Sequence, residues 1–209
     1  MTRRCSWIAA LLTLNFACLP ADNTGDGGET EVISRLQLTF TPPGGGTPVV
    51  AMFDDPDGDS GVSGMADAIT LPNGVTFELD VAFVNGLAEP PVDITTEVEA
   101  EAEEHLVLVF GDAVQGPASS SVLALVEHAY ADRESDYGDN AVGEDLPLGV
   151  RSTVTTERAG TRSLRVMLRH MPPIGGEIQK RADVPELAAM DQPLPGDVDA
   201  DVTFALTVQ

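Results

Sequence analysis

Residues 75–84 read VTFELDVAFV, and the alternation of apolar and polar side chains in this stretch decides the fold class. Phe77, Leu79, Val81 and Phe83 share one side of an extended chain, because successive side chains of a β-strand point to opposite faces. Residues 163–170, SLRVMLRH, show the same period, and their apolar face ends in His170. Each stretch therefore predicts a strand with one face packed on a core.

Further stretches of this kind follow one another along the chain, separated by turns rich in Gly, Pro, Asn and Asp. Besides 75–84 and 163–170, we expect strands at 32–40, 47–53, 68–71, 106–110, 122–130, 149–156 and 202–208. Many short strands without an internal repeat predict a mainly β protein with a single antiparallel, immunoglobulin-like β-sandwich.

Residues 93–110, DITTEVEAEAEEHLVLVF, depart from this pattern. Read as a strand, the acidic part would place its glutamates on one face, but Ala and Glu favour helices over strands. The stretch therefore predicts a short acidic helix at about 93–105, with Asp93 as its N-cap, followed by a buried strand. The inward stripe of that helix would contain Ile94, Val98, Glu101 and His105. A second short helix is expected at about 184–190.

The N-terminus has the features of an export signal. Arg3 and Arg4 precede the apolar stretch WIAALLTL, which is too short to span a bilayer. The segment resembles a bacterial lipoprotein signal, in which a Cys after a small residue is acylated, although Asn15 stands where such signals usually carry Leu. An ordinary secretory signal cut near Ala17 is the alternative. Lipidation would explain why Cys18 is the one cysteine left after cleavage.

These features predict three parts: a signal peptide at 1–17, a flexible acidic tether at 18–30 and a β-sandwich domain at 31–209. The expected location is the bacterial cell envelope, with the protein anchored to a membrane by lipid on Cys18. No inner-membrane retention signal follows Cys18, which favours the outer membrane.

The chain is strongly acidic, with 34 Asp and Glu residues against 11 Lys and Arg, a formal net charge of −23. Removal of residues 1–17 takes away two basic residues and no acidic ones, which gives −25. Such a chain repels nucleic acid, so nucleic-acid binding is excluded as an expected function. Its charged partners would be metal cations or basic protein surfaces, although most of the acids serve simply to keep the protein soluble.

With these elements in order, the chain resembles a family of small bacterial lipoproteins described as type 1 periplasmic binding fold superfamily proteins. The similar stretches are LTFTPPGGGTPVV with DDPDGD, PPVDITTEVEAEAEEH, PLGVRSTVTT, SLRVMLRHMPP and DVTFALTVQ. The resemblance assigns no catalytic or ligand residues to this chain. The family name is not taken as a fold statement, because two α/β lobes need alternating helices and strands that this β pattern lacks. The acidic stretch 131–149 is longer here than in the family pattern.

The three histidines are the strongest candidates for chemistry. His105 ends the acidic helix, while His128 and His170 each continue the apolar face of a strand. Imidazoles beside a carboxylate such as Glu101 would suit Zn or Cu(II). The alternative is that each histidine is a hydrogen-bonded residue at the rim of the core. A metal site shared by His105 and His170 requires their rings to lie within about 8 Å of each other, since metal–nitrogen bonds are ~2.1 Å.

Two acidic loops are weaker candidates for calcium, which prefers several oxygen ligands. Asp55, Asp57 and Asp59 alternate in DPDGDSG, and Asp132 and Asp136 lie in the second loop. The first loop does not match the EF-hand template, because Ser60 stands where the sixth position requires Gly. Asx turns at the ends of hairpins are the alternative explanation for both loops.

No phosphate-binding loop, dinucleotide motif or nucleophile elbow occurs in the sequence, so catalysis is not expected. The sequence favours a non-catalytic binding module of the envelope that holds Zn or Cu, as an accessory to uptake by an envelope protein. The alternative is a metal-free interaction or adhesion module that presents an acidic surface to a protein partner.

Overall fold

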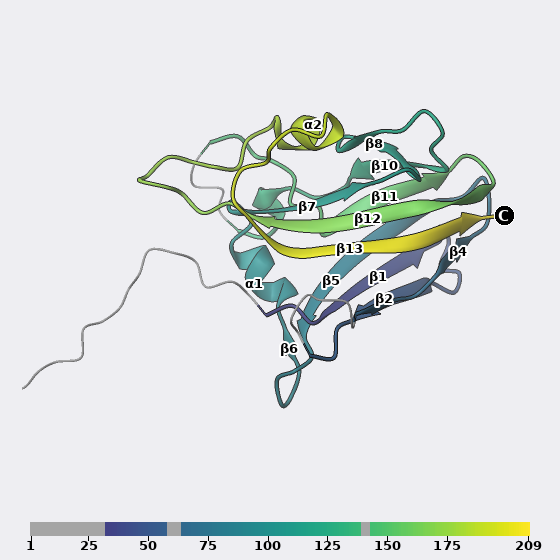
Figure 1. Cartoon of the computed structure of the whole chain (residues 1–209), viewed down its shortest axis with the longest axis horizontal. Coiled ribbons are helices and arrows are strands. Elements are labelled where there is room, and N and C mark those ends of the chain that lie inside the picture. The colour runs from purple at the N-terminus through teal and green to yellow at the C-terminus, as the bar shows by residue number, and fades with distance from the viewer. Residues whose placement is uncertain (1–31, 58–63, 139–142) are drawn as a thin grey trace, which may run out of the picture.

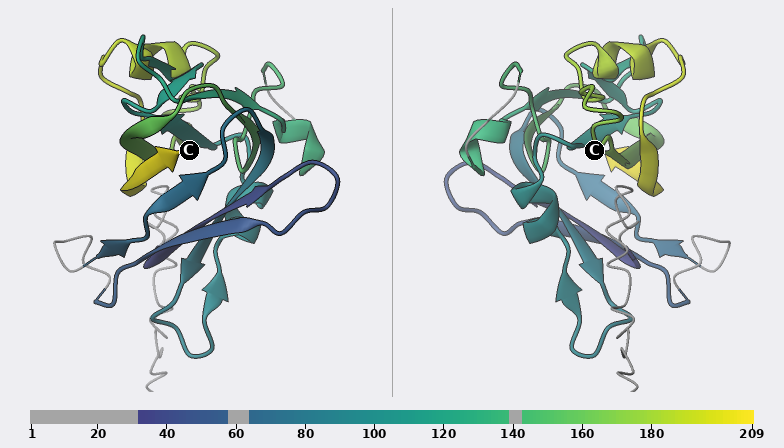
Figure 2. Two further views of the ribbon diagram at one scale, coloured as in Figure 1. Left: turned by 90° about the vertical axis from the view of Figure 1, so that its right-hand side faces the viewer. Right: turned by 90° about the vertical axis from the view of Figure 1, so that its left-hand side faces the viewer.

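The computed structural model describes residues 32–57, 64–138 and 143–209, and its dominant feature is two facing β-sheets. In Figure 1 the green and yellow strands of the smaller sheet cross the purple and blue strands of the larger one. The end-on views of Figure 2 show the two layers lying against each other. The signal segment, Cys18, the tether and Asp59 lie outside the described residues.

The strand order defines each sheet. The larger sheet contains, in order across it, β3 (Met65–Ala66), β2 (Val49–Asp54), β1 (Arg35–Thr41), β5 (Thr76–Asn85), β11 (Arg151–Thr156), β10 (Val126–Tyr130), β8 (Val114–Gly116) and β9 (Ser119–Ser120), with β6 (Val92–Asp93) paired to β5. The smaller sheet contains β4 (Ile69–Leu71), β13 (Asp197–Val208), β12 (Gly160–His170) and β7 (His105–Phe110). The described helices are α1 (Thr95–Ala100), α2 (Val184–Ala189) and the short 3₁₀ turn η1 (Glu134–Asp136).

The predicted β-sandwich is confirmed, and each expected strand is present with its ends moved by a few residues. Strands β3, β6, β8 and β9 are too short to show a period of two, which is why the sequence pattern did not predict them. Pairing is antiparallel except between β10 and β8 and between β13 and β4, where the strands run parallel.

The core between the sheets follows from the alternation in the sequence. Along most of β5, in the second half of β12 and in the second half of β13, every second side chain is apolar and buried between the layers. Those side chains are Phe77, Leu79, Val81 and Phe83 from β5, Leu164, Val166 and Leu168 from β12, and Val202, Phe204, Leu206 and Val208 from β13. At roughly 1.5–3 kcal/mol for each fully buried large apolar side chain, this layer supplies most of the drive to fold.

Strand β7 is apolar at successive positions because both of its faces are covered. Val107 and Val109 face the core between the sheets, whereas Leu106 and Leu108 belong to a second cluster on the outer side. That cluster includes Val184 of α2. In Figure 1 the helix α2 lies on the outer side of the smaller sheet. A strand buried on both sides loses the polar alternation, which explains the continuous apolar sequence.

Helix α1 is shorter than the sequence predicted. It ends at Ala100, and a turn closed by a hydrogen bond from the Glu104 N–H to the Glu101 carbonyl leads into β7. The expected inward stripe is therefore correct at Ile94 and Val98 but wrong at Glu101, which is exposed, and Ala102 is buried in its place.

The expected N-cap is also wrong at the start of this helix. Ile94 is the N-cap, and Asp93 instead accepts a hydrogen bond from the Thr95 N–H at 3.0 Å. The second helix lies where it was expected. None of the described helices has the length and apolar character needed to cross a membrane.

A buried ion pair fastens the segment 172–183 to the sandwich. Lys180 Nζ lies 2.7 Å from Glu134 Oε1, and these two side chains are only 1% and 3% exposed. Lys180 also donates a hydrogen bond to the carbonyl of Ala102, at 2.7 Å. Burial lowers the pKa of Lys180, and the carboxylate of Glu134 opposes that shift. The pair thereby links three segments that are far apart in the sequence.

Breaking this pair should be costly, because the remaining charge would stay buried without its counter-ion. We expect Lys180→Met to lower the free energy of unfolding by about 3–5 kcal/mol, and the double variant Lys180→Met/Glu134→Leu to recover most of that loss. Urea unfolding of both variants measures the difference. A double variant that loses as much stability as Lys180→Met, or more, would contradict the expected cost of the uncompensated buried charge.

Candidate metal centre

His105 and His170 are brought together by the register of two strands. His105 is the first residue of β7 and His170 is the last residue of β12, and the two are direct partners in this antiparallel pair. Side chains at directly opposed positions lie on the same face of a sheet. Both histidines thus lie on the inner face of the sheet, next to the pair Val107 and Leu168 on that face, where the apolar core ends.

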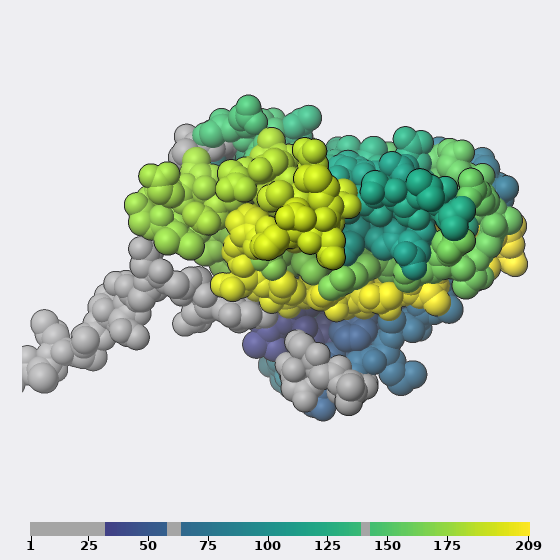
Figure 3. Space-filling view, turned by 45° about the horizontal axis from the view of Figure 1, so that its top comes forward, coloured from purple at the N-terminus to yellow at the C-terminus, as the bar shows by residue number. Residues whose placement is uncertain are grey.

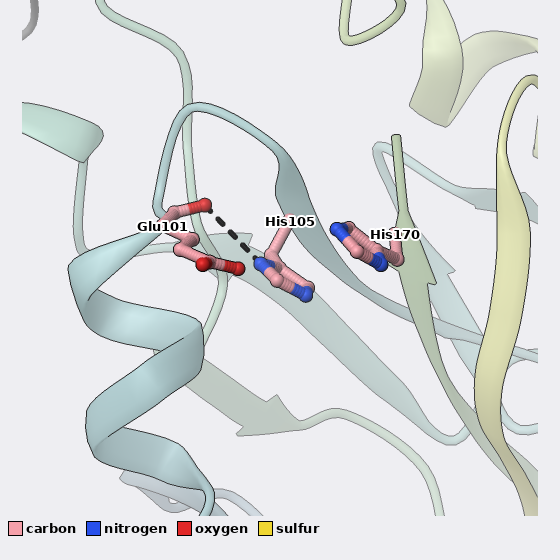
Figure 4. Close-up of side chains that lie close together, drawn as sticks. All are labelled: Glu101, His105 and His170. Atoms are coloured by element: carbon pink, nitrogen blue, oxygen red, sulfur yellow. Dashed lines mark hydrogen bonds between the residues drawn. The ribbon is translucent and has the colours of Figure 1, made fainter. Parts of the chain in front are cut away.

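The two imidazole rings are stacked and buried. Their centroids are 4.4 Å apart and their planes differ by 8°. His105 is 0% exposed and His170 is 5% exposed. The spacing is well inside the limit of about 8 Å that a shared metal site requires. Figure 4 shows the parallel rings, with Glu101 on the far side of His105 from His170.

A backbone hydrogen bond orients His105. Its Nδ1 lies 3.2 Å from the carbonyl oxygen of Glu101, the dashed line in Figure 4. Because a carbonyl can only accept, this bond requires the proton on Nδ1, so in the neutral ring the lone pair lies on Nε2. Metal-bound histidines typically make such a bond, which fixes the tautomer and the ring orientation.

The Nε2 atom of His105 faces a buried carboxylate. Asp199 Oδ2 lies 3.8 Å away, and the Asp199 side chain is 1% exposed. Asp199 sits where the register of β12 and β13 shifts, since Leu168 pairs with Ala200 but Arg169 pairs with Val198. This β-bulge inserts one extra residue and so allows the carboxylate to lie on the inner side.

The turn before β13 holds the bulge in place. The Arg169 guanidinium donates hydrogen bonds to the carbonyls of Leu194, at 3.2 Å, and Pro195, at 3.1 Å. Gly196 has a φ of +70°, and a Cβ there would lie 2.0 Å from the His170 carbonyl oxygen. Only glycine therefore allows the turn to approach β12 this closely.

A second carboxylate lies beside the other ring. Glu104 Oε2 is 3.6 Å from His170 Nε2, and the Glu104 side chain is 33% exposed. The Met171 N–H donates to the Glu104 carbonyl at 2.6 Å, which holds the turn before β7 against the end of β12. Each imidazole is thus accompanied by its own acid, one buried and one at the surface.

Three side chains can offer ligand atoms to one ion. One atom each from Glu101, His105 and His170 lies within 4.8 Å of the others, and no other such group of three or more occurs in residues 32–57, 64–138 and 143–209. Two ligands of a tetrahedral zinc ion lie about 3.4 Å apart. The nitrogen–oxygen distances of 3.6 and 3.8 Å, to Glu104 and Asp199, are close to this value.

The stacked rings are not arranged as two ligands of a single ion. Imidazole lone pairs lie in the ring plane, so rings 4.4 Å apart and nearly parallel direct their lone pairs along parallel lines. One ring must rotate before both can coordinate. His170 is the more exposed of the two rings, since its side chain is 7% exposed whereas that of His105 is 0% exposed.

The remaining candidates lie elsewhere. His128 is in β10, 2% exposed, with its ring edge-on to Tyr130 at 5.1 Å, and it is not a member of the cluster. Neither of its nitrogens has a hydrogen-bond partner among the described residues. Burial lowers the pKa of His128 to about 4, so the ring is neutral near pH 7.

The acids of the second loop have partners within the protein. The Asp132 carboxylate accepts hydrogen bonds from the N–H groups of Gly149 and Arg151, at 2.7 and 2.8 Å, and from the Tyr137 hydroxyl at 2.9 Å. Asp136 accepts from the Arg133 N–H at 2.9 Å. The Asp132 bonds reach residues 17 and 19 positions away, so they join this loop to the start of β11 and are not the Asx turns offered as the alternative to calcium.

Part of the first loop is described. Asp55 is 2% exposed and, with Asp199, lines a small cavity of about 40 Å³, whereas Asp57 is exposed. Neither belongs to a group of three ligands in the part of the chain that the structure describes.

Sequence reasoning missed Glu104 and Asp199. Glu104 directly precedes His105, but a helix continuing to residue 105 would have placed the Glu104 side chain outside the inward stripe, so it was not considered. Asp199 belongs to the alternation DVDADV, which assigns Asp199 to the solvent face unless a bulge is known. Gly196, which directly precedes the strand that contains Asp199, was a usable signal of irregular backbone, since a glycine before a strand often marks a close approach of two backbone segments.

Comparison with known proteins finds no matching family model, no similar curated protein and no similar solved structure.

The neutral state of His128 should make the protein sensitive to acid. Its pKa of about 4 in the folded state lies below the ordinary value of 6.5, so the unfolded chain takes up a proton first as the pH falls. The free energy of unfolding should drop by about 2–3 kcal/mol between pH 7 and 4.5 through this group alone. In His128→Leu this contribution disappears. If the free energy of unfolding fell equally with pH in the wild type and in His128→Leu, the lowered pKa of His128 would be contradicted.

Proposed function

We propose that this protein binds one divalent transition metal ion, Zn²⁺ or Cu²⁺, through His105, His170 and a carboxylate. The observation that carries the proposal is the convergence of ligand atoms from Glu101, His105 and His170 within 4.8 Å of one another. These residues come from the end of α1 and from two paired strands, so the fold itself brings them together.

The donor set selects the class of metal. Two imidazole nitrogens with one carboxylate suit Zn²⁺ or Cu²⁺, whereas Ca²⁺ and Mg²⁺ prefer six or more oxygens. Glu104 and Asp199 lie beside the two rings and can act as a further ligand or as hydrogen-bond acceptors that orient the imidazoles. Acids at this site also compensate the charge of the cation.

Binding requires a local rearrangement. The bond from His105 Nδ1 to the Glu101 carbonyl keeps His105 in place, while rotation of the His170 ring ends the stack and turns its lone pair toward the same point. Because Glu101 is exposed, its carboxylate can follow the ion without loss of core packing. We propose that His105 is the fixed ligand and His170 the adjusting one.

The cellular setting belongs to the same proposal. We place the protein in the cell envelope, held to a membrane by lipid on Cys18, as a non-catalytic accessory that presents metal to an envelope uptake protein. The lone cysteine after residues 1–17 and the net charge of −23 support this setting. Membrane fractionation of Cys18→Ser tests the anchor, since release from the membrane is expected and unchanged fractionation would contradict it.

Metal titration tests the site directly. The purified, metal-free protein should bind one equivalent of Zn²⁺ or Cu²⁺ in isothermal titration calorimetry at pH 7.5. His105→Ala and His170→Ala should each weaken binding by at least about 100-fold, because each removes a ligand. Binding should also weaken below about pH 6, where protons compete for the imidazoles.

His128→Leu is the matched control, since it removes a histidine outside the cluster and should leave the affinity unchanged. Glu104→Gln and Asp199→Asn should weaken binding by about 10- to 100-fold if they orient the rings. A dissociation constant no better than tens of micromolar for both metals would contradict the proposal. That result would favour a metal-free interaction module that presents its acidic surface to a basic protein.

A further inference from the structure

A cavity of about 630 Å³ lies beside the metal-site cluster, between the segment 171–182, the segment 143–146 and the turn that precedes β7. In Figures 1 and 3 the segment 171–182 forms the yellow-green projection at the left-hand end of the molecule. The volume lies within the range of sites for small organic molecules. Glu104 lines this cavity and also faces His170, so the two sites share one residue.

The charged side chains in the wall of the cavity are predominantly acidic. Five glutamates line it, against one lysine and one arginine: Glu103, Glu104, Glu134, Glu144, Glu177, Lys180 and Arg181. Both basic groups already face carboxylates, because Lys180 pairs with Glu134 at 2.7 Å and Arg181 pairs with Asp183 at 3.0 Å. A concave surface with this excess of negative charge attracts cations and repels anions.

The rest of the wall is apolar. Leu146, Met171, Pro173 and Ile178 contribute hydrocarbon surface, which a hydrated metal ion would not contact favourably. An organic body suits this surface better than an inorganic ion. The described lining has no aromatic side chain, so it lacks the cation–π contacts that recognise quaternary ammonium groups. The cation must therefore be recognised by hydrogen bonds to carboxylates.

We propose that this cavity binds a small organic cation, a primary amine or guanidinium carried on a short apolar chain. The charged group lies against the carboxylates of Glu103 and Glu104, and the chain packs on Met171 and Ile178. The buried ion pair of Lys180 and Glu134 fixes the position of the segment that forms this wall. This site does not depend on the proposed metal binding, although its use of Glu104 would couple the two.

Three ligands with the same body and different charge test the proposal: n-hexylamine, n-hexanol and n-hexanoate. Each is titrated into the full protein, labelled at methionine and isoleucine methyl groups, at low ionic strength and in the presence of a chelator. We expect hexylamine to shift the methyl resonances of Met171 and Ile178 with saturation, and to bind at least about tenfold tighter than the other two. Met190, which does not line the cavity, is the internal control.

A pair of double variants separates local recognition from overall charge. Glu103→Gln/Glu104→Gln should weaken hexylamine binding by at least about tenfold. Glu127→Gln/Glu157→Gln removes the same charge from exposed positions that do not line the cavity, and should leave binding within about twofold of the wild type. Equal binding of the three ligands would overturn the proposal, as would the absence of methyl shifts with hexylamine up to about 20 mM. The chelator removes metal from every arm, so failure of the metal proposal would not alter these results.

Discussion

The antiparallel pairing of β7 with β12 is the constraint on which the site depends. Its register is set by apolar side chains that must face the core, Val107 and Val109 on one strand and Val166 and Leu168 on the other. Because side chains alternate, a slip of one residue would move one imidazole to the opposite face of the sheet. Burial of the core thus determines that the two histidines meet, and no direct attraction between them is required.

From the core outward, the side chains at this end of the sandwich change from apolar to imidazole and then to acidic. The inner face passes from hydrocarbon to the stacked imidazoles, then to carboxylates, one buried at Asp199 and others near or at the surface at Glu101 and Glu104. A cation that reaches the histidines gains from each of these acids. The acidic cavity beside Glu104 continues the same gradient outward, so one residue connects an inner site for a metal with an outer site for an organic cation.

Local periodicity was sufficient to predict the sandwich and the strand faces, because each depends on which side chains a buried strand can tolerate. The pair His105–His170 was a hypothesis from the sequence, since His105 was expected at the end of a helix, and the register of β7 and β12 brings the two residues together. Local periodicity was insufficient where tertiary structure overrides the pattern. Helix α1 ends at Ala100 and a turn leads into β7, although the acidic sequence continues to favour a helix, and Asp199 turns inward through a bulge that no alternation reveals. The ion pair between Lys180 and Glu134 joins segments 46 residues apart, and their charges alone gave no sign of burial.

Zinc K-edge X-ray absorption on the zinc-loaded protein tests the central claim most directly, because it reports ligand types and distances at the ion itself. We expect two imidazole nitrogens at about 2.0–2.1 Å and at least one carboxylate oxygen at about 2.0–2.2 Å, with one imidazole lost in His170→Ala. A shell made of oxygen alone, or a spectrum unchanged by that substitution, would contradict it.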